Sequence, residues 1–364
     1  MVKVTHLTSA HPRYDTRIFS KMCSSLAKEY EVNLVVADGK GDEIRNNVTI
    51  IDVGAKTGGR LSRMTKSVTK VYKKAKELDS DIYHLHDPEL IPIGVKLKKL
   101  GKKVIFDAHE DVPKQILAKH YLNSFSKKIL SFIYAKYEIY ALKKFDFVIT
   151  ATPIIKENFL QAGIKSKDIN NFPTVDDFLK LSPQFEENTF CYVGTLYKTR
   201  GIEEIVKAIE EVDAKLIIAG KFYDEEYEKY IKSLKGWKKV DFRGFVDKDE
   251  ILKILENSLA GLVTLYPTPS YVEAYPVKMF EYMASGIGVI SSNFSLYKEL
   301  LGDSGIVVDP LNIDEISKAM QFCIDNKEKT REFGKIGRKL VKDKYNWENE
   351  EKKLFDIYKC DCQL

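Results

Sequence analysis

The chain has 364 residues, 44% hydrophobic and 30% charged, a composition typical of a globular protein long enough for two domains. No run approaches about 18 uninterrupted apolar residues, which excludes a membrane-spanning helix, and the apolar stretch at the N-terminus is too short for a secretory signal. Five scattered cysteines fit a reducing compartment better than a disulfide framework, so we expect a cytoplasmic protein. We interpret Cys360 and Cys362 as part of a loose tail.

The net charge of +5 conceals an asymmetry between the two halves of the chain. Residues 1–175 carry 30 Lys and Arg against 19 Asp and Glu, whereas the remainder carries 28 against 34. All six histidines also precede residue 121. Halves that differ so much in charge are expected to meet different partners.

Short β-branched runs alternate with helical periodicity throughout the chain. In the first half, periodic stretches predict helices at Arg17–Glu29 and Thr65–Leu78. The predicted strands of that half are Val2–Thr8, Glu31–Ala37, Thr49–Val53, Ile82–His86, Lys103–Ala108 and Phe147–Ala151. Those of the second half are Thr189–Gly194, Lys215–Gly220, Val240–Phe242, Leu259–Leu265, Gly288–Ser291 and Gly305–Val308. Helices are predicted between them at Ile202–Val212, Asp224–Leu234, Lys248–Asn257, Val277–Ala284 and Asp314–Asn326.

Such alternation predicts an α/β protein with two doubly wound, Rossmann-like domains. Prolines and acidic residues interrupt the pattern near Thr174–Asn188, so we place the domains at 1–175 and 176–345. We expect residues 346–364 to form a helix or tail that packs back on the first domain. Ligands of such sheets bind beyond the carboxyl ends of the strands, which predicts one interdomain cleft.

The richest motif runs from Pro269 to Gly286. A buried strand is followed by a Pro-rich loop, a helix that begins at about Pro276, and Gly286 as a helix stop. The unpaired N–H groups of residues 277–279 and the helix dipole form a site suited to a diphosphate. Glu273 and Glu281 stand on either side of it, and their carboxylates suit sugar and ribose hydroxyls.

Here the sequence resembles the retaining glycosyltransferases of family 4, which have the GT-B fold. Their donor site carries Glu-x7-Glu in this context, matched by Glu273 through Glu281, and the resemblance extends over essentially the whole chain. It is strongest at His84–Pro92, Val104–Gln115, Tyr192–Ile205 and Pro269–Ser291. Within the family the chain looks most like bacterial enzymes of surface-polysaccharide assembly, which share the Asp-Thr-Arg-Ile-Phe loop and the His-Glu-Asp turn. The resemblance implies that Glu273 acts in catalysis and that Ala274, Tyr275, Pro276, Val277, Lys278 and Glu281 bind the donor.

A second donor segment runs from Tyr192 to Gly201. The family carries a Gly-Arg pair here and a later basic residue before a second glycine. Gly194 and Arg200 match this pattern, but Thr195 replaces the usual Arg, and we expect Lys198 to substitute for it. Cations at a helix start are disfavoured unless an anion binds there, so this segment is expected to contact the diphosphate.

The resemblance also implies a site residue in the first domain and the position of the nucleobase. His109 matches the family histidine that reaches the transferred sugar from the opposite domain. Backbone near Lys221 and Phe245–Val246 is expected to bind the nucleobase, which leaves uracil, guanine and adenine open. The polar loop after the first strand, with residues near the next two strand ends, predicts an acceptor site of His11, Arg13, Asp15, Arg17, His86 and Glu110.

The sequence offers two Asp-x-Asp pairs but, on our interpretation, no metal site. Asp79 and Asp81 precede their strand and so lie on the wrong side of the sheet, while Asp247 and Asp249 suit the start of a helix. We therefore expect no metal and no cofactor, with the helix dipole and the basic side chains neutralising the departing diphosphate.

Two basic segments of the first half predict contact with an anionic membrane surface. Residues 56–76 carry eight Lys or Arg and no acid, and residues 114–144 carry seven with one Glu. The second segment is interleaved with the aromatic residues Tyr121, Phe125, Phe132, Tyr134, Tyr137 and Tyr140. A solvated helix face and a nucleic-acid patch are the alternatives, although no nucleic-acid module is visible.

The sequence thus predicts a metal-independent retaining glycosyltransferase that moves a sugar from a nucleoside-diphosphate sugar, with UDP favoured over GDP. The acceptor is expected to be a glycan or a polyprenyl-diphosphate-linked glycan in surface-polysaccharide assembly. A nucleotide-sugar epimerase and a non-catalytic, membrane-associated sugar-binding scaffold remain as alternatives. An NAD-dependent dehydrogenase is disfavoured because no Gly-x-Gly-x-x-Gly follows the first strand.

Overall fold

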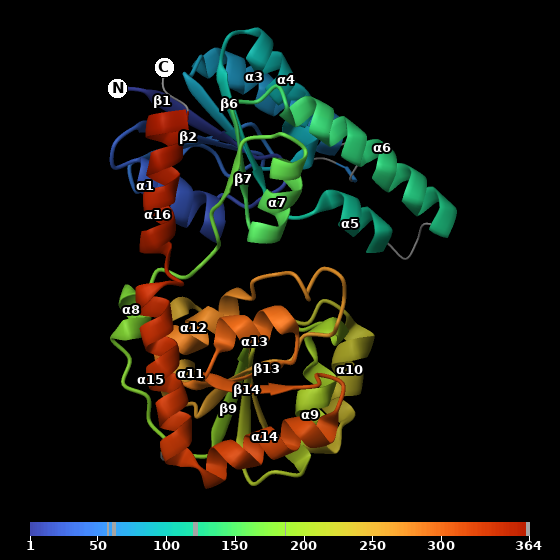
Figure 1. Cartoon of the computed structure of the whole chain (residues 1–364), viewed down its shortest axis with the longest axis vertical. Helices are drawn as coiled ribbons and strands as arrows, with labels where there is room; N and C mark the ends of the chain where they lie inside the picture. The colour runs from blue at the N-terminus through green and yellow to red at the C-terminus, as the bar shows by residue number, and fades with distance from the viewer. Residues whose placement is uncertain (57, 60–62, 119–122, 186, 362–364) are drawn as a thin grey trace. The chain divides into compact units, whose positions relative to one another are not determined.

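The computed structural model describes residues 1–56, 58–59, 63–118, 123–185 and 187–361. It separates into two compact units (Figure 1), the first formed by Met1–Asn171 with Glu348–Leu364 and the second by Phe172–Trp347. The division falls just before the stretch in which the sequence suggests a join. No helix in the described ranges is both long and apolar enough to cross a bilayer.

The first unit contains an eight-stranded sheet in the order β3-β4-β2-β1-β5-β6-β7-β8. All six strands predicted for this half are present, and the pairing is parallel except between β3 and β4. Two further strands of three residues each, β3 and β8, close the edges. The strands are β1 (Lys3–Leu7), β2 (Glu31–Val36), β3 (Glu43–Arg45), β4 (Val48–Asp52), β5 (Ile82–Leu85), β6 (Lys103–Ala108), β7 (Phe147–Thr150) and β8 (Ser166–Asp168).

Helices of the first unit cover both faces of this sheet. The helix predicted at Arg17–Glu29 is a π-helix (Thr16–Cys23) that continues as α1 (Ser24–Leu26), and the next predicted helix is α3 (Val68–Leu78) preceded by a π turn. The others are a 3₁₀ turn (Pro88–Leu90), α4 (Ile91–Lys99), α5 (Val112–Ala118), α6 (Ser124–Leu142) and α7 (Pro153–Gln161).

The C-terminal helix α16 (Trp347–Asp356) belongs to the first unit for most of its length. The Glu350 carboxylate accepts a hydrogen bond from the Asn170 backbone N–H at 2.9 Å. In the turn that follows α16, the Tyr358 hydroxyl lies 2.8 Å from Nδ1 of His84, a buried residue of β5. The C-terminal segment is therefore part of the core of the first unit.

The second unit contains a six-stranded, all-parallel sheet in the order β11-β10-β9-β12-β13-β14. All six strands and all five helices predicted for this half are present, together with α8, α13 and α15. The strands are β9 (Thr189–Val193), β10 (Lys215–Ala219), β11 (Val240–Gly244), β12 (Ala260–Val263), β13 (Gly288–Ser292) and β14 (Gly305–Val308). The helices are α8 (Asp176–Leu179), α9 (Ile202–Glu210), α10 (Glu225–Ser233), α11 (Lys248–Glu256), α12 (Val277–Ser285), α13 (Ser295–Leu301), α14 (Ile313–Asp325) and α15 (Lys327–Asp343).

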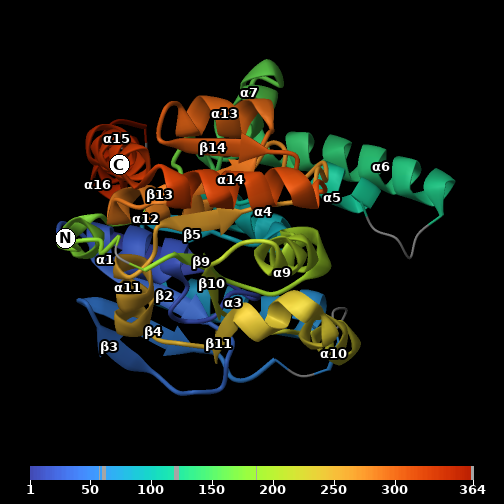
Figure 2. The same cartoon turned by 90° about the horizontal axis from the view of Figure 1, so that it is seen from below.

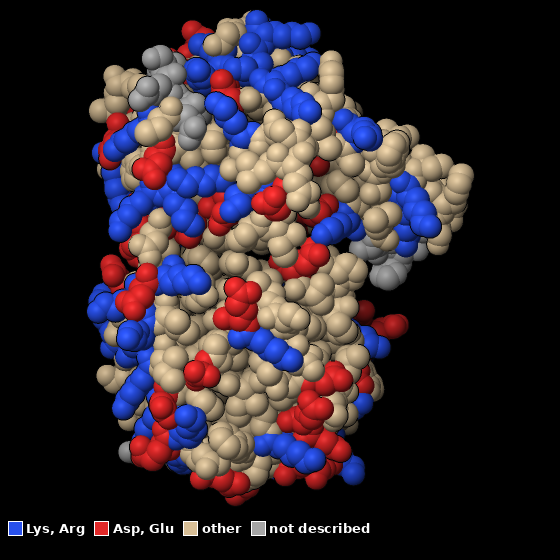
Figure 3. All heavy atoms as spheres, viewed as in Figure 1, with Lys and Arg blue, Asp and Glu red and all other residues tan. Residues whose placement is uncertain are grey.

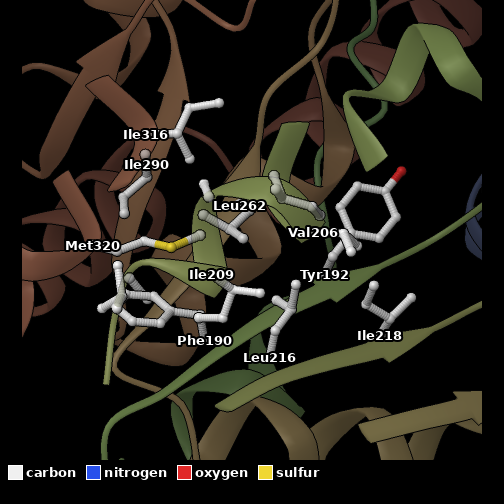
Figure 4. Close-up of a cluster of buried hydrophobic side chains, with 14 of the residues drawn as sticks. Phe190, Tyr192, Val206, Ile209, Leu216, Ile218, Leu262, Ile290, Ile316 and Met320 are labelled. Carbon is white, nitrogen blue, oxygen red and sulfur yellow. The ribbon is translucent and has the colours of Figure 1, made fainter. Parts of the chain in front are cut away.

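Two separate apolar layers sandwich the sheet of the second unit. Because side chains alternate along a strand, Phe190 and Tyr192 face α9 and α14, whereas Cys191 faces α12. The first layer is drawn in Figure 4, and α9 and α14 pack against each other over it (Figure 2). Each fully buried aliphatic or aromatic side chain contributes about 1.5–3 kcal/mol, so these layers fix the strand ends that carry the site.

Candidate active site

Helix α12 begins directly after a loop at the carboxyl end of β12. Pro276 is its N-cap residue, and Gly286, with a φ of 78°, ends the helix in the left-handed region as predicted. The N–H groups of Val277 and Lys278 precede the first α-helical hydrogen bond, but Met279 N–H donates to the Pro276 carbonyl at 2.9 Å. The expectation of three unpaired N–H groups is therefore wrong for Met279, because the first turn is tightened by this bond.

The side chain of Lys278 points back toward the carboxyl end of β9. Its Nζ lies 3.7 Å from the centre of the Tyr192 ring and 2.9 Å from the place that a Cβ on Gly194 would occupy. Burial and the nearby Arg200 guanidinium hold the pKa of Lys278 well below its usual value, and the Glu281 carboxylate opposes this shift. Gly194 has a φ of 143°, so its missing side chain and its backbone conformation both make room for the ammonium group.

Arg200 is the second cation of this region. Its guanidinium carbon lies 4.8 Å from the Tyr271 ring centre, and its Nε is buried without a hydrogen-bond partner. Within the described ranges, neither Arg200 nor Lys278 forms an ion pair with a carboxylate. Thr195 and Lys198 are exposed, and it is Lys278 rather than Lys198 that stands beside Gly194.

The two glutamates of the Glu-x7-Glu pattern lie on either side of the start of α12. Glu273 lies in the turn before Pro276 and Glu281 in the second turn of the helix, both half-buried. Between them, Ala274 N–H donates to the Tyr271 carbonyl at 3.3 Å, and the Tyr275 ring stacks on Phe172 with centroids 5.8 Å apart. The loop is therefore held by backbone bonds and ring packing within the second unit.

The residues predicted to surround the nucleobase follow β10 and β11. Lys221 and Phe245 are exposed, Phe245 with 87% of its surface accessible, and Val246 is half-buried. The Lys221 carbonyl accepts from Leu196 N–H at 3.1 Å, which ties the loops after β9 and β10 together. The structure thus places these residues at neighbouring strand ends of one sheet.

In the first unit, His109 follows β6 and its Nε2 lies 2.9 Å from Oδ2 of Asp107. Asp107 is fully buried and is also bound by Arg17, whose Nη2 and Nε lie 2.7 and 2.9 Å from its two oxygens. The His109 side chain is 19% exposed, and its ring lies tilted against that of His11, with ring centroids 4.8 Å apart. The imidazole of His109 is therefore partly exposed to solvent, and its Nε2 is held by the buried Asp107 carboxylate.

Three of the residues predicted to bind the acceptor have buried side chains that are engaged in internal contacts. Arg13 is 4% exposed and pairs with Asp38 at 2.6 Å and with Glu43 at 2.8 Å. Arg17 is 4% exposed and is held by Asp107 and the Ile169 carbonyl. His86 is 2% exposed, and its ring meets that of His109 edge-on with centroids 5.5 Å apart. The acceptor role of these three residues stays a prediction.

The other residues of the acceptor prediction lie near the surface. Asp15 caps the π-helix by accepting from the N–H groups of Arg17 and Ile18. The His11 nitrogens lie 3.5 Å from Asp15 and 3.3 Å from Asp87; burial lowers the pKa of His11, but these carboxylates outweigh it and raise the pKa. Glu110 is exposed beside His109. His11 and Glu110 thus stay on one side of the first unit with His109.

Two groups of neighbouring ligand-type atoms occur in the described ranges, His6 with His84 and His86, and His86 with Asp107 and His109. Internal hydrogen bonds already engage the Asp107 oxygens and both nitrogens of His86. Of the two Asp-x-Asp pairs, Asp81 accepts a hydrogen bond from Lys3 N–H, and Asp247 caps α11 as predicted.

The sequence did not single out Asp107 as a site residue. It stands at the end of an apolar strand, which is a weak signal, and its partner Arg17 is 90 residues away. The two basic segments are only partly covered: residues 57, 60–62 and 119–122, including Tyr121, lie outside the described residues, as does Cys362. Tyr134 points inward and its hydroxyl donates to Glu138 at 3.2 Å.

Comparison with known proteins gives two adjoining family matches. Residues 17–174 match the model described as Glycosyltransferase Family 4, and residues 176–340 match the model described as Glycosyl transferases group 1. An uncharacterised glycosyltransferase of Methanocaldococcus jannaschii is 25% identical over 288 residues, which cover 72% of this chain and 70% of that protein. The O-antigen chain mannosyltransferase RfbU of Salmonella typhimurium is 25% identical over 255 residues, 65% of this chain and 68% of its own.

Among solved structures, Anabaena HepE in complex with UDP and glucose superposes with a TM-score of 0.74 at 16% identity, covering 98% of this chain and 99% of that one. Identity at this level shows the fold alone. The two family matches divide the chain close to the boundary between its two parallel-sheet units. The chain therefore belongs to the family 4 glycosyltransferases and has the GT-B fold.

Proposed function

We propose that the protein transfers a glycosyl unit, with retention at the anomeric carbon, from a nucleoside-diphosphate sugar to a glycan or a polyprenyl-diphosphate-linked acceptor. The observation that carries the proposal is the pair Arg200 and Lys278. Two neighbouring cations, each resting on an aromatic ring and neither ion-paired within the described ranges, stand beside the open N-terminus of α12. Such an arrangement is stable when an anion such as a diphosphate binds it.

In the proposed reaction the bond between the anomeric carbon and the phosphate oxygen breaks and a bond to the acceptor hydroxyl oxygen forms on the same face. The departing phosphate oxygen takes the acceptor proton. Arg200, Lys278 and the first N–H groups of α12 stabilise the charge that develops on the diphosphate, so the proposal needs no metal. Glu273 orients the transferred sugar, Glu281 binds the ribose, and His109 contacts the sugar.

UDP is the favoured nucleotide. The HepE structure contains UDP and glucose, whereas O-antigen chain mannosyltransferases of two bacteria are among the sequence relatives. A donor panel therefore includes UDP-sugars first and GDP-mannose second. Thermal unfolding with each nucleotide ranks them, because a ligand at 100 times its Kd adds about 2.7 kcal/mol to the free energy of unfolding.

Turnover tests the reaction itself and its alternatives. Nucleoside-diphosphate release from the selected donor is measured with and without acceptor glycans, and we expect Glu273→Ala to lower it by at least tenfold. Activity of Glu273→Ala within threefold of wild type would refute the role given to this residue. Conversion of the donor to a second nucleotide sugar without acceptor would indicate an epimerase. Absence of even a single turnover with every donor would indicate a sugar-binding scaffold.

The proposal extends to the location of the protein, which we place at the inner face of the cytoplasmic membrane through helix α6. Four of its apolar side chains, Phe125, Phe132, Ile133 and Tyr140, are between 58% and 75% exposed. Its one carboxylate, Glu138, is buried. The space-filling view shows the outer part of this helix covered by uncharged side chains with lysines between them (Figure 3).

This surface has the chemistry of a helix that lies in the interface of an anionic bilayer. Lys128 and Lys136 are exposed among the apolar groups, and Lys136 Nζ lies 5.5 Å from the Phe132 ring centre. Each cation near such a surface contributes about 1 kcal/mol. A solvated helix face, by contrast, does not carry so many exposed apolar side chains in one patch.

Sedimentation with vesicles tests the membrane proposal. We expect binding to phosphatidylglycerol-containing vesicles, little binding to phosphatidylcholine alone, and at least a tenfold loss in Phe125→Ser/Phe132→Ser. Phe322→Ser, which changes an exposed phenylalanine of α14, serves as the matched control. Equal binding by both variants, or preferential binding of duplex RNA over the anionic vesicles, would contradict the proposal.

A further inference from the structure

Asp107, a buried carboxylate next to His109, lies within hydrogen-bond distance of one arginine and two histidines. Asp107 lies on β6 with its side chain fully buried. Its Oδ2 lies 2.9 Å from His109 Nε2, 3.2 Å from His86 Nδ1 and 2.9 Å from Arg17 Nε, and its Oδ1 lies 2.7 Å from Arg17 Nη2. No other carboxylate of the described ranges receives an arginine and two imidazoles together.

Asp107 remains ionised despite its burial. Burial raises the pKa of this carboxyl, but the Arg17 guanidinium and the surrounding imidazoles outweigh it and hold the pKa well below its usual value. An ionised carboxylate only accepts hydrogen bonds. His86 Nδ1 and His109 Nε2 also lie 3.3 Å from each other, but each lies closer to Asp107 than to the other nitrogen. Because an unprotonated nitrogen would turn its lone pair toward the charged carboxylate, we assign a proton to both.

The histidines behind His109 are neutral and fixed. Because His86 Nδ1 donates to Asp107, its Nε2 is an acceptor, and His6 Nδ1 donates to it at 2.8 Å. Burial lowers the pKa of His86 to about 4, with Asp107 opposing the shift, and holds the pKa of His6 well below its usual value. These rings cannot take up a second proton near neutral pH, so the stack holds His109 in place rather than conducting protons from it.

We propose that Asp107 and Arg17 are positioning residues for His109. The Asp107 carboxylate keeps the His109 proton on Nε2, and Nδ1 is thereby left as the hydrogen-bond acceptor that receives a sugar hydroxyl. This inference rests on the proposed function in that it assigns the hydroxyl to a sugar, while the tautomer itself is a property of the free protein. Arg17 acts at one remove, by keeping Asp107 ionised and oriented.

The tautomer is measured without any substrate. Histidine labelled with ¹⁵N is incorporated, and the His109 signals are assigned by their loss in His109→Asn. We expect a protonated-type shift for Nε2 and an unprotonated-type shift for Nδ1 in the wild type, with both moving toward an averaged tautomer mixture in Asp107→Asn. A protonated Nδ1 in the wild type, or an unchanged tautomer in Asp107→Asn, would overturn the proposal.

Kinetics give a second readout. Asp107→Asn is expected to lower kcat at least tenfold while the donor KM changes less than threefold. If Arg17, left without its anion, prevents this variant from folding, the pair His109→Asn and His109→Gln decides. The Asn amide oxygen can occupy the position of Nδ1, whereas the Gln amide reaches toward Asp107, so Asn should retain at least tenfold more activity. Equal or reversed activities would count against the assignment. Failure of the wild type to turn over any donor would refute the proposed function but leave the NMR result standing.

Discussion

The ammonium group of Lys278, a residue of α12, lies 3.7 Å from the centre of the ring of Tyr192, a residue of β9. This cation–π contact contributes about 0.5–2 kcal/mol of favourable interaction energy. No carboxylate of the described ranges forms an ion pair with Lys278. It joins β9 to α12 at the point where the family carries an arginine and this chain carries Thr195. Lys278 is therefore the residue on which the donor site can be tested most directly.

Lys278→Met should weaken binding of UDP about 10- to 100-fold, because one charge-assisted contact with the diphosphate is lost. Lys198→Met is the matched control, since Lys198 is an exposed lysine of the same region, and its effect should stay below threefold. Isothermal titration calorimetry measures both. A larger effect of Lys198→Met would return the role to the residue that the sequence favoured.

The double variant Lys278→Met/Thr195→Arg tests whether one cation replaces the other. If Lys278 stands in for the arginine usual at position 195, restoring that arginine should recover at least half of the lost binding free energy. Thr195→Arg alone should change UDP affinity less, because the site already holds two cations. Additive effects of the two substitutions would show that they act at independent positions.

Donor binding should weaken as pH rises through the pKa of Lys278. Burial, and secondly Arg200, hold the pKa of Lys278 below the ordinary 10.5, so the amine of the free protein loses its proton earlier than an exposed lysine. Bound diphosphate favours the charged form; affinity is therefore highest below the Lys278 pKa and falls by up to about tenfold per pH unit above it. The Kd of UDP-glucose is measured against pH in the wild type and in Lys278→Arg, in which the fall should disappear.

Glu138→Gln should remove a pH dependence of stability. Burial raises the pKa of Glu138 to about 7, against the hydrogen bond from Tyr134 and with the help of the Asp111 charge. Since this lies above the ordinary 4.5, the native state binds more protons than the unfolded state between the two values, and wild-type stability falls as pH rises through that window. Relative to wild type, the Glu138→Gln variant should gain up to about 3 kcal/mol between about pH 4.5 and about pH 8. The free energy of unfolding is measured with urea at both pH values. An equal difference between the two proteins at the two pH values would contradict this prediction.

The regular elements were predictable because buried parallel strands are short, continuous apolar runs. Residues 216–218 of β10 form an apolar run that predicts a strand by itself, whereas β3 and β8 have only three residues each and show no such pattern. The start of α12 was also readable, since Pro276 and Gly286 mark its ends locally. What could not be read was which polar groups meet across long separations.

Arg17 illustrates that limit. Its place in a polar loop after the first strand suggested a surface-exposed, ligand-binding side chain, but the π-helix turns it inward onto Asp107, 90 residues away. Arg13 is also turned inward, because its partners Asp38 and Glu43 lie on the neighbouring loop and edge strand. Sequence alone gives the charge of a loop but not the direction of its side chains.

The return of the C-terminal segment to the first unit makes the two units unequal in the path of the chain. Residues 172–347 form one uninterrupted unit, whereas the first unit combines Met1–Asn171 with Glu348–Leu364. Contacts of the C-terminal segment with Asn170 and His84 join residues 180 and 274 positions apart in the sequence. Because contacts between distant residues require the closure of a long loop, the first unit is expected to fold more slowly than the second.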